Sequence, residues 1–289
     1  MVTRQHAVAR AGPVLLVLAL TACDPADSTG GVAPSADPDR PGYQQYEDGG
    51  PVGRHITGLR LSGQMQLKVQ AGATTSVHRT VHYQDTDPGS GTWRVAGDAV
   101  ELSGCTVPRC LVTYDVTVPA STALSGELNS GNALVRGIGP VDLSARSGTV
   151  DIQQISGAVK LEAGSTAANV TNVDGPVDAT VDSGQFTAQN VHGPLSVHGG
   201  SGTVVAHGIS GPATLDLRSA EVTLGMASAQ DVSASVSSGS LGITVPQSAY
   251  HVVSTTDSSE LNSTVPDDPA GAHRITLALN SASASLDFG

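Results

Sequence analysis

Four polar residues recur at intervals of 18 along this chain: Glu162, Thr180, His198 and Asp216. If the chain stacks with an 18-residue period, their side chains form one outward column with neighbours about 4.8 Å apart. His198 and Asp216 would then lie close enough to share a metal ion or to form a general acid–base pair. The alternative, which we favour, is a solvent-exposed ladder with a weak attraction between His and Asp.

Other groupings of titratable residues point to surface contacts. Clustered aspartates can hold calcium, and Asp178 lies between two further aspartates at 174 and 182. Stacking would place Lys160 beside Asp178, which predicts a surface ion pair worth under about 1 kcal/mol. His78 and His82 stand four positions apart on an expected strand, roughly 13 Å from each other and too far to chelate one ion.

Motifs of the common enzyme classes are missing from the sequence. It contains no H-E-x-x-H, P-loop, G-x-S-x-G or dinucleotide-binding fingerprint. We therefore expect no catalytic residue, no metal ligand and no cofactor.

Cys23 is the residue with the most specific chemical expectation. Residues 1–22 combine a positive start at Arg4 and Arg10 with a short apolar core, which is typical of a signal peptide. The segment ends in Leu-Thr-Ala before Cys23, the pattern of a bacterial lipobox. We expect the thiol of Cys23 to carry a diacylglycerol anchor. The alternative is an ordinary secreted protein with a chance cysteine.

Cys105 and Cys110 lie between two expected strands. An extracytoplasmic location permits a disulfide, and this spacing would close a short loop. The predicted role of the pair is therefore a structural bridge. A redox role is the alternative, although the C-x-x-C spacing is absent.

A repeat of about 18 residues carries most of the chain. Serines, usually followed by glycine, recur in steps of 17, 18, 18, 18, 18 and 19 residues, at Ser130, Ser147, Ser165, Ser183, Ser201, Ser219 and Ser238. Apolar and polar residues alternate in each half of the repeat, the period of a strand with one buried face. Ser-Gly and Gly-Pro are turn residues, so each repeat predicts strand, corner, strand, corner. The serines are expected to bond backbone at corners, because no His or Asp recurs with them.

One repeat is too small to fold alone, so the copies must stack and share a core. The predicted fold is all-β, a single-stranded β-solenoid with about 18 residues per turn and irregular β caps, over residues 54–289. It comprises an irregular part at 54–120, regular repeats at 121–245, and C-terminal turns with a cap at 246–289. Residues 23–53 are rich in Asp, Pro and Gly, which predicts a disordered tether behind the lipid anchor.

The charge of the chain excludes one class of partner. Its formal net charge is −12, and removing the signal peptide with Arg4 and Arg10 would leave −14. Nucleic acid is not an expected partner, because there is no basic patch to displace counterions. The single Trp also argues against an aromatic sugar-binding groove.

Several runs of sequence resemble a bacterial family of β-strand-repeat domains described as "putative adhesins" and of unknown function. The runs are Val116-Thr117-Val118-Pro119-Ala120, Leu128-Asn129-Ser130-Gly131, and Ile243-Thr244-Val245-Pro246 before Tyr250. The resemblance covers about residues 54–289. It implies a β-solenoid at the cell envelope and transfers no catalytic residue.

Together these observations predict a non-enzymatic cell-surface lipoprotein that displays a β-solenoid as a binding, adhesin-like scaffold. Its expected partners are the membrane, through the lipid, and a cell-wall polymer or surface protein. One alternative is an envelope-stress or signalling accessory that binds a membrane partner. Another is a carbohydrate-active β-helix enzyme, which would need a groove with converging carboxylates.

Overall fold

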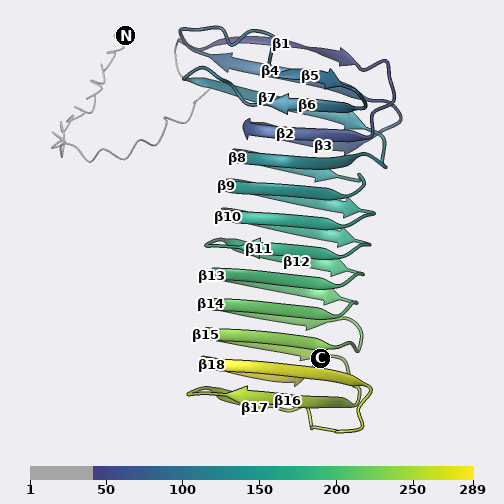
Figure 1. The fold of residues 1–289 in the computed structure, drawn as a ribbon, viewed down its shortest axis with the longest axis vertical. Coiled ribbons are helices and arrows are strands. Elements are labelled where there is room, and N and C mark those ends of the chain that lie inside the picture. The colour runs from purple at the N-terminus through teal and green to yellow at the C-terminus, as the bar shows by residue number, and fades with distance from the viewer. Residues whose placement is uncertain (1–41) are drawn as a thin grey trace, which may run out of the picture. The chain divides into compact units, whose positions relative to one another are not determined.

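A computed structural model describes residues 42–289 of the chain. The predicted signal peptide at 1–22, the anchor at Cys23 and most of the predicted tether lie outside the described residues. Residues 42–289 form 18 strands joined in one hydrogen-bonded sheet, so the described part is all-β (Figure 1). This part contains no helix long and apolar enough to cross a membrane.

The centre of the described part is a stack of repeat units, each of which we call a rung. Neighbouring rungs pair in parallel (Figure 1). Val159 pairs with Val141 of the preceding rung and Val177 of the following one, so the sequence period is the step between rungs. The rungs are β8 (Ala123–Arg136), β9 (Val141–Ile155), β10 (Val159–Val173), β11 (Val177–Val181) with β12 (Gln185–Val191), β13 (Leu195–Ile209), β14 (Ala213–Met226) and β15 (Val232–Val245).

Most Ser-Gly corners bend a strand without interrupting its pairing. Ser147 and Gly148 pair with Ser165 and Thr166 inside the continuous strands β9 and β10. Among the central rungs, the corner separates two strands only between β11 and β12. The prediction of two strands per repeat is therefore wrong for the other central rungs, because the corner residues keep their hydrogen bonds to the rungs beside them.

The interior of each rung is filled by small aliphatic side chains. In β9 these are Val141, Leu143, Ala145, Val150 and Ile152, all buried. Each stacks on the equivalent residue of the next rung, so the core continues from rung to rung. Such burial stabilises by about 1–3 kcal/mol for each larger aliphatic side chain.

The second corner of the rungs needs a left-handed backbone. Gln154, Asn172 and Asn190 occupy this position in successive rungs with φ of 57°, 56° and 55°. Asparagine tolerates this region better than most residues with side chains. The Asn190 side-chain amide also donates to Oδ1 of Asn172 at 3.0 Å, which ties two corners together.

The rung order at the C-terminal end differs from the order in sequence. β18 (His273–Phe288) pairs with β15 on one side and with β16 (Tyr250–Thr256) and β17 (Glu260–Ser263) on the other. From its place in the sequence, the copy beginning at Ser281 would be the last rung. The pairing of β18 shows that it is not. The reason lies in the inward residues: Leu277 of β18 is buried, whereas Ser254, its partner in β16, is exposed.

The N-terminal end is also out of sequence order. β2 (Gly58–Gln64) and β3 (Gln66–Ala71) form a rung between β8 and the rung made by β6 (Ala99–Ser103) and β7 (Cys110–Val118). β4 (Ser76–Tyr83) and β5 (Trp93–Ala96) then pair antiparallel with β7 and β6. The irregular part predicted at 54–120 thus continues the parallel stack for two rungs and adds antiparallel strands beyond them.

The outermost N-terminal strand, β1 (Gln44–Pro51), pairs antiparallel with β4. It lies inside the segment 23–53 predicted as a tether, so that prediction is wrong for residues 44–51. The strand has almost no apolar residues, and its position depends on backbone pairing and on a contact with the buried Arg79.

The guanidinium of Arg79 closes this end of the core. The side chain is fully buried, forms an ion pair with Asp48 of β1, and donates to the hydroxyl of Thr92. It also lies 5.4 Å from the ring centroid of Tyr46. Burial opposes the charge, but the hydrogen bond and charge of Asp48 outweigh burial and raise the pKa of Arg79.

We expect Asp48→Ala to destabilise the protein by about 3 kcal/mol, because it leaves the Arg79 charge buried and uncompensated. The double variant Asp48→Ala, Arg79→Met removes that charge as well and should recover much of the loss. Urea unfolding of both variants measures the difference. Equal losses in the single and double variants would contradict the proposed cost of the lone charge.

Tyr114 is buried beside this cluster, with its hydroxyl 2.7 Å from the carbonyl oxygen of Thr92. Burial is the main cause that raises its pKa to about 12. Because the folded pKa exceeds the ordinary value of 10, its contribution to stability is complete below pH 10 and is lost as pH rises towards 12. Urea unfolding between pH 8 and pH 12 should show a shallower alkaline loss in Tyr114→Phe than in the wild type.

Candidate functional site

The predicted column of Glu162, Thr180, His198 and Asp216 exists in the structure. Strand register pairs each residue with the next. Nε2 of His198, however, lies 2.9 Å from the hydroxyl of Ser196, and His198 makes no ion pair with Asp216 within residues 42–289. Nor does this part of the chain contain a group of three or more His, Cys, Asp or Glu side chains that could hold a metal ion. The column is therefore a ladder of exposed polar residues.

The other predicted charge pairs change partner. Lys160 is in register with Asp178, but its Nζ lies 3.7 Å from Oε1 of Glu162. The predicted Lys160–Asp178 ion pair is therefore wrong, because Glu162 projects from the same face of the same strand. Asp174 instead lies 3.0 Å from Nδ1 of His192 in the next rung.

His78 and His82 are not brought together at one site. Nε2 of His78 lies 3.6 Å from a carboxylate oxygen of Glu47 on β1. This contact belongs to the pairing of the two outermost N-terminal strands.

Cys105 and Cys110 form the predicted disulfide, with their Cα atoms 5.8 Å apart. The bridge closes the corner between β6 and β7, where the regular rungs have Ser-Gly. The amide of Gly104, beside the bridge, donates to the carbonyl oxygen of Ser62 in the next rung at 2.8 Å. The disulfide therefore stabilises an irregular corner of the stack.

Two corner serines show the predicted contact with backbone. The hydroxyl of Ser147 donates to the carbonyl oxygen of Asn129 at 3.3 Å, and that of Ser238 donates to the carbonyl oxygen of Arg218 at 3.3 Å. In both contacts the serine joins its rung to the preceding one, which is a structural role.

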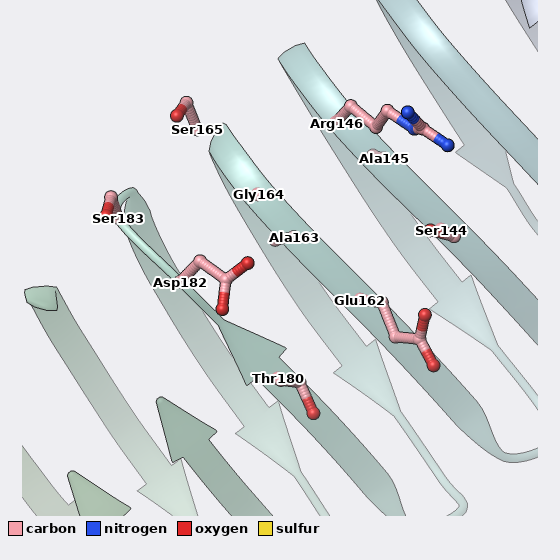
Figure 2. Close-up of a pocket in the computed structure, with 10 residues that line it drawn as sticks. All are labelled: Ser144, Ala145, Arg146, Glu162, Ala163, Gly164, Ser165, Thr180, Asp182 and Ser183. Atoms are coloured by element: carbon pink, nitrogen blue, oxygen red, sulfur yellow. The ribbon is translucent and has the colours of Figure 1, made fainter. Parts of the chain in front are cut away.

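A polar groove of about 530 Å³ crosses the outer surface of β9, β10 and β11 near these corners (Figure 2). Arg146 and Asp182 lie on opposite sides of Gly164, and Glu162 lies at one side of the groove (Figure 2). Its full lining is Ser144, Ala145, Arg146, Glu162, Ala163, Gly164, Ser165, Thr180, Asp182 and Ser183. The groove carries both signs of charge.

The groove belongs to a longer row that we call the charged column. It consists of Arg146, Gly164, Asp182, Gly200 and Arg218, one residue from each of five successive rungs, each just before the corner serine. All three charged side chains are exposed. The sequence carries the signal for this column, since its members also recur every 18 residues. The sequence-based prediction missed it because it followed the neighbouring column of His198 and Asp216.

A second groove, of about 440 Å³, lies over β3, β7, β8 and β9. Leu134 lines this groove, and its large hydrophobic side chain is 37% exposed. Lys68 and Asp115, also in the lining, are 2.7 Å apart and neutralise each other. This groove presents one small apolar patch beside the carboxylate of Asp151, which accepts hydrogen bonds from the Gln153 amide.

No family model matches the chain, and no curated protein matches it. Solved structures with low similarity include a "putative cell adhesion protein" from Clostridium sporogenes, with 10% identity and a TM-score of 0.23 over 85% of this chain and 100% of the other. A "putative adhesin" from Bacteroides fragilis has 10% identity and a TM-score of 0.39 over 85% and 97%. One from Parabacteroides merdae has 11% identity and a TM-score of 0.35 over 85% and 96%.

Proposed function

We propose that this chain is a non-enzymatic lipoprotein of the cell envelope that displays a β-solenoid as a binding, adhesin-like scaffold. The observation that carries the proposal is the charged column. Its three unpaired charges are held at fixed intervals by hydrogen-bonded rungs. A surface of this kind can bind an extended partner without a conformational change.

The remaining features support this role. Stacked rungs with a continuous apolar core give a rigid support, while their outward residues can vary without disturbing the core. An acid–base mechanism requires titratable residues to converge on one point. The residues singled out from the sequence do not converge: Glu162, His198 and Asp174 contact separate partners. The lipobox before Cys23 supports attachment to a membrane.

Binding to envelope material tests the proposal directly. The purified full chain should bind isolated cell-wall material in a saturable manner and should sediment with it. Failure to bind any wall fraction, together with capture of one specific membrane protein, would favour the signalling-accessory alternative instead.

The anchor has a separate test. A Cys23→Ala variant of the full chain should leave the membrane fraction of the cell, because one transferred lipid group is lost. Its retention in the membrane would contradict lipidation at this residue while leaving the binding role open.

A further inference from the structure

We propose that the charged column binds a linear zwitterionic polymer of the cell envelope, with anionic groups at Arg146 and Arg218 and a cationic group at Asp182. The inference rests on the proposed function and names the chemistry of its ligand. The first observation is that the three charged side chains of the column form no ion pair within the described residues. Several other outward cations of residues 42–289 are neutralised by carboxylates of the same chain, namely Arg60, Lys68, Arg94, Arg109 and Lys160.

Arg146, Asp182 and Arg218 behave differently from those residues. None forms an ion pair with another residue of the described part of the chain, although all three are exposed. One rung lies between each of them and the next, and the guanidinium of Arg146 extends away from Asp182 (Figure 2). Their charges are therefore available to a ligand.

The glycines of the column leave room for that ligand. Gly164 lies between Arg146 and Asp182 (Figure 2), and Gly200 lies beyond Asp182 in the next rung. A Cβ atom would lie 2.7 Å from the carbonyl oxygen of Arg146 at the first position and 2.8 Å from that of Asp182 at the second. Side chains are thus excluded from both positions, and the two gaps alternate with the three charges.

The spacing of the column sets the pattern of the ligand. Rungs are about 4.8 Å apart, so the backbone positions of successive charged residues are about 10 Å apart and those of the two arginines about 19 Å apart. The complementary ligand has the order anion, cation, anion with the same interval. A chain with a regular repeat meets this requirement along a straight row, which is why we assign a polymer rather than a folded protein surface.

Two heptapeptides of the same length test the charge pattern. In Asp-Gly-Gly-Lys-Gly-Gly-Asp, blocked at both ends, extended charges are about 10 Å apart, whereas Lys-Gly-Gly-Asp-Gly-Gly-Lys reverses every sign. At low ionic strength the full chain should bind the first about tenfold more tightly than the second, the product of three weak exposed ion pairs. Fluorescence anisotropy with labelled peptides measures this ratio, which should shrink as salt is added.

Matched variants locate the binding. Asp182→Asn, and Arg146→Gln combined with Arg218→Gln, should each remove most of the preference for the first peptide. Arg136→Gln is the control, since its Nε donates to Gln154 at the other corner of the rung. Equal binding of the two peptides, or a preference that survives both sets of variants, would overturn the inference.

Wall polymer separates this inference from the proposed function. N-acetylation of the amino groups of isolated wall polymer should weaken binding of the wild type and leave binding of Asp182→Asn unchanged. Undiminished binding to acetylated polymer would refute the charged column as the site while leaving the proposed function intact. No binding to untreated polymer would refute the proposed function itself.

Discussion

Leu277→Asp is expected to cost more than about 3 kcal/mol of stability, whereas Ser254→Asp is expected to be nearly neutral. The two residues are partners in adjacent strands, and both occupy positions of the inward column. Leu277 is 1% exposed because β18 is covered by rungs on both sides. An aspartate there would be buried without a partner, which is among the most destabilising changes possible.

Ser254 is the matched control because it lies on the outermost C-terminal rung, where an added carboxylate stays in water. Urea unfolding, with limited proteolysis to find the weakened segment, compares the two variants. If the rungs followed the order of the sequence, β16 would cover β15 and Ser254→Asp would be the damaging change. That reversed result would contradict the observed rung order.

This rung order is the main part of the fold that was not predicted from the sequence. The 18-residue repeat correctly predicted stacked copies that pair in parallel. Val141, Val159 and Val177 are equally spaced, so only one register aligns the apolar residues of successive copies. At the ends the copies are imperfect, and chain order is the simplest expectation for them. The polar inward residues of β16, such as Ser254 and Thr256, were a usable signal, since only an end rung can leave them in water.

β1 was missed for a different reason. Its sequence around Tyr46 and Asp48 has the composition of a tether, and no periodic pattern marks it as a strand. The strand is held by backbone pairing with β4 and by the buried Arg79. A charge inside a core is rarely predicted from sequence, because the strand pattern of β4 only says which side of it faces inwards.

The candidate site itself was not predicted from the sequence. The sequence indicated outward polar columns, and the register of Glu162 and His198 follows that expectation. Which column remains unpaired depends on side-chain reach. Lys160, for example, contacts Glu162 within its own strand and not Asp178 in the neighbouring one. Such choices between partners at similar distances lie beyond a pattern of residue types.

Gly148→Ala should be among the most damaging single changes in the corners, with a loss of more than about 3 kcal/mol. Gly148 has φ of +113°, a conformation that strains any residue with a side chain. Its Cβ would also fall on the carbonyl oxygen of Gly131 in the preceding rung, far inside contact distance. Gly148 pairs with Gly131 and Thr166. Avoiding the clash with Gly131 would therefore require β8 and β9 to separate at the corner.

Gly242→Ala is the control for this change because it adds the same methyl group to a strand with space around it. The nearest atom to its Cβ would be the hydroxyl of Ser285 at 3.8 Å, an ordinary contact, and its φ is not positive. Replacing a strand glycine under those conditions should stabilise by about 0.5 kcal/mol, because the unfolded chain loses freedom. Urea unfolding of both variants should therefore give changes of opposite sign. Two small and equal changes would mean that the Ser-Gly corners are not sterically closed, and that the glycine there is not what fixes the rungs in register.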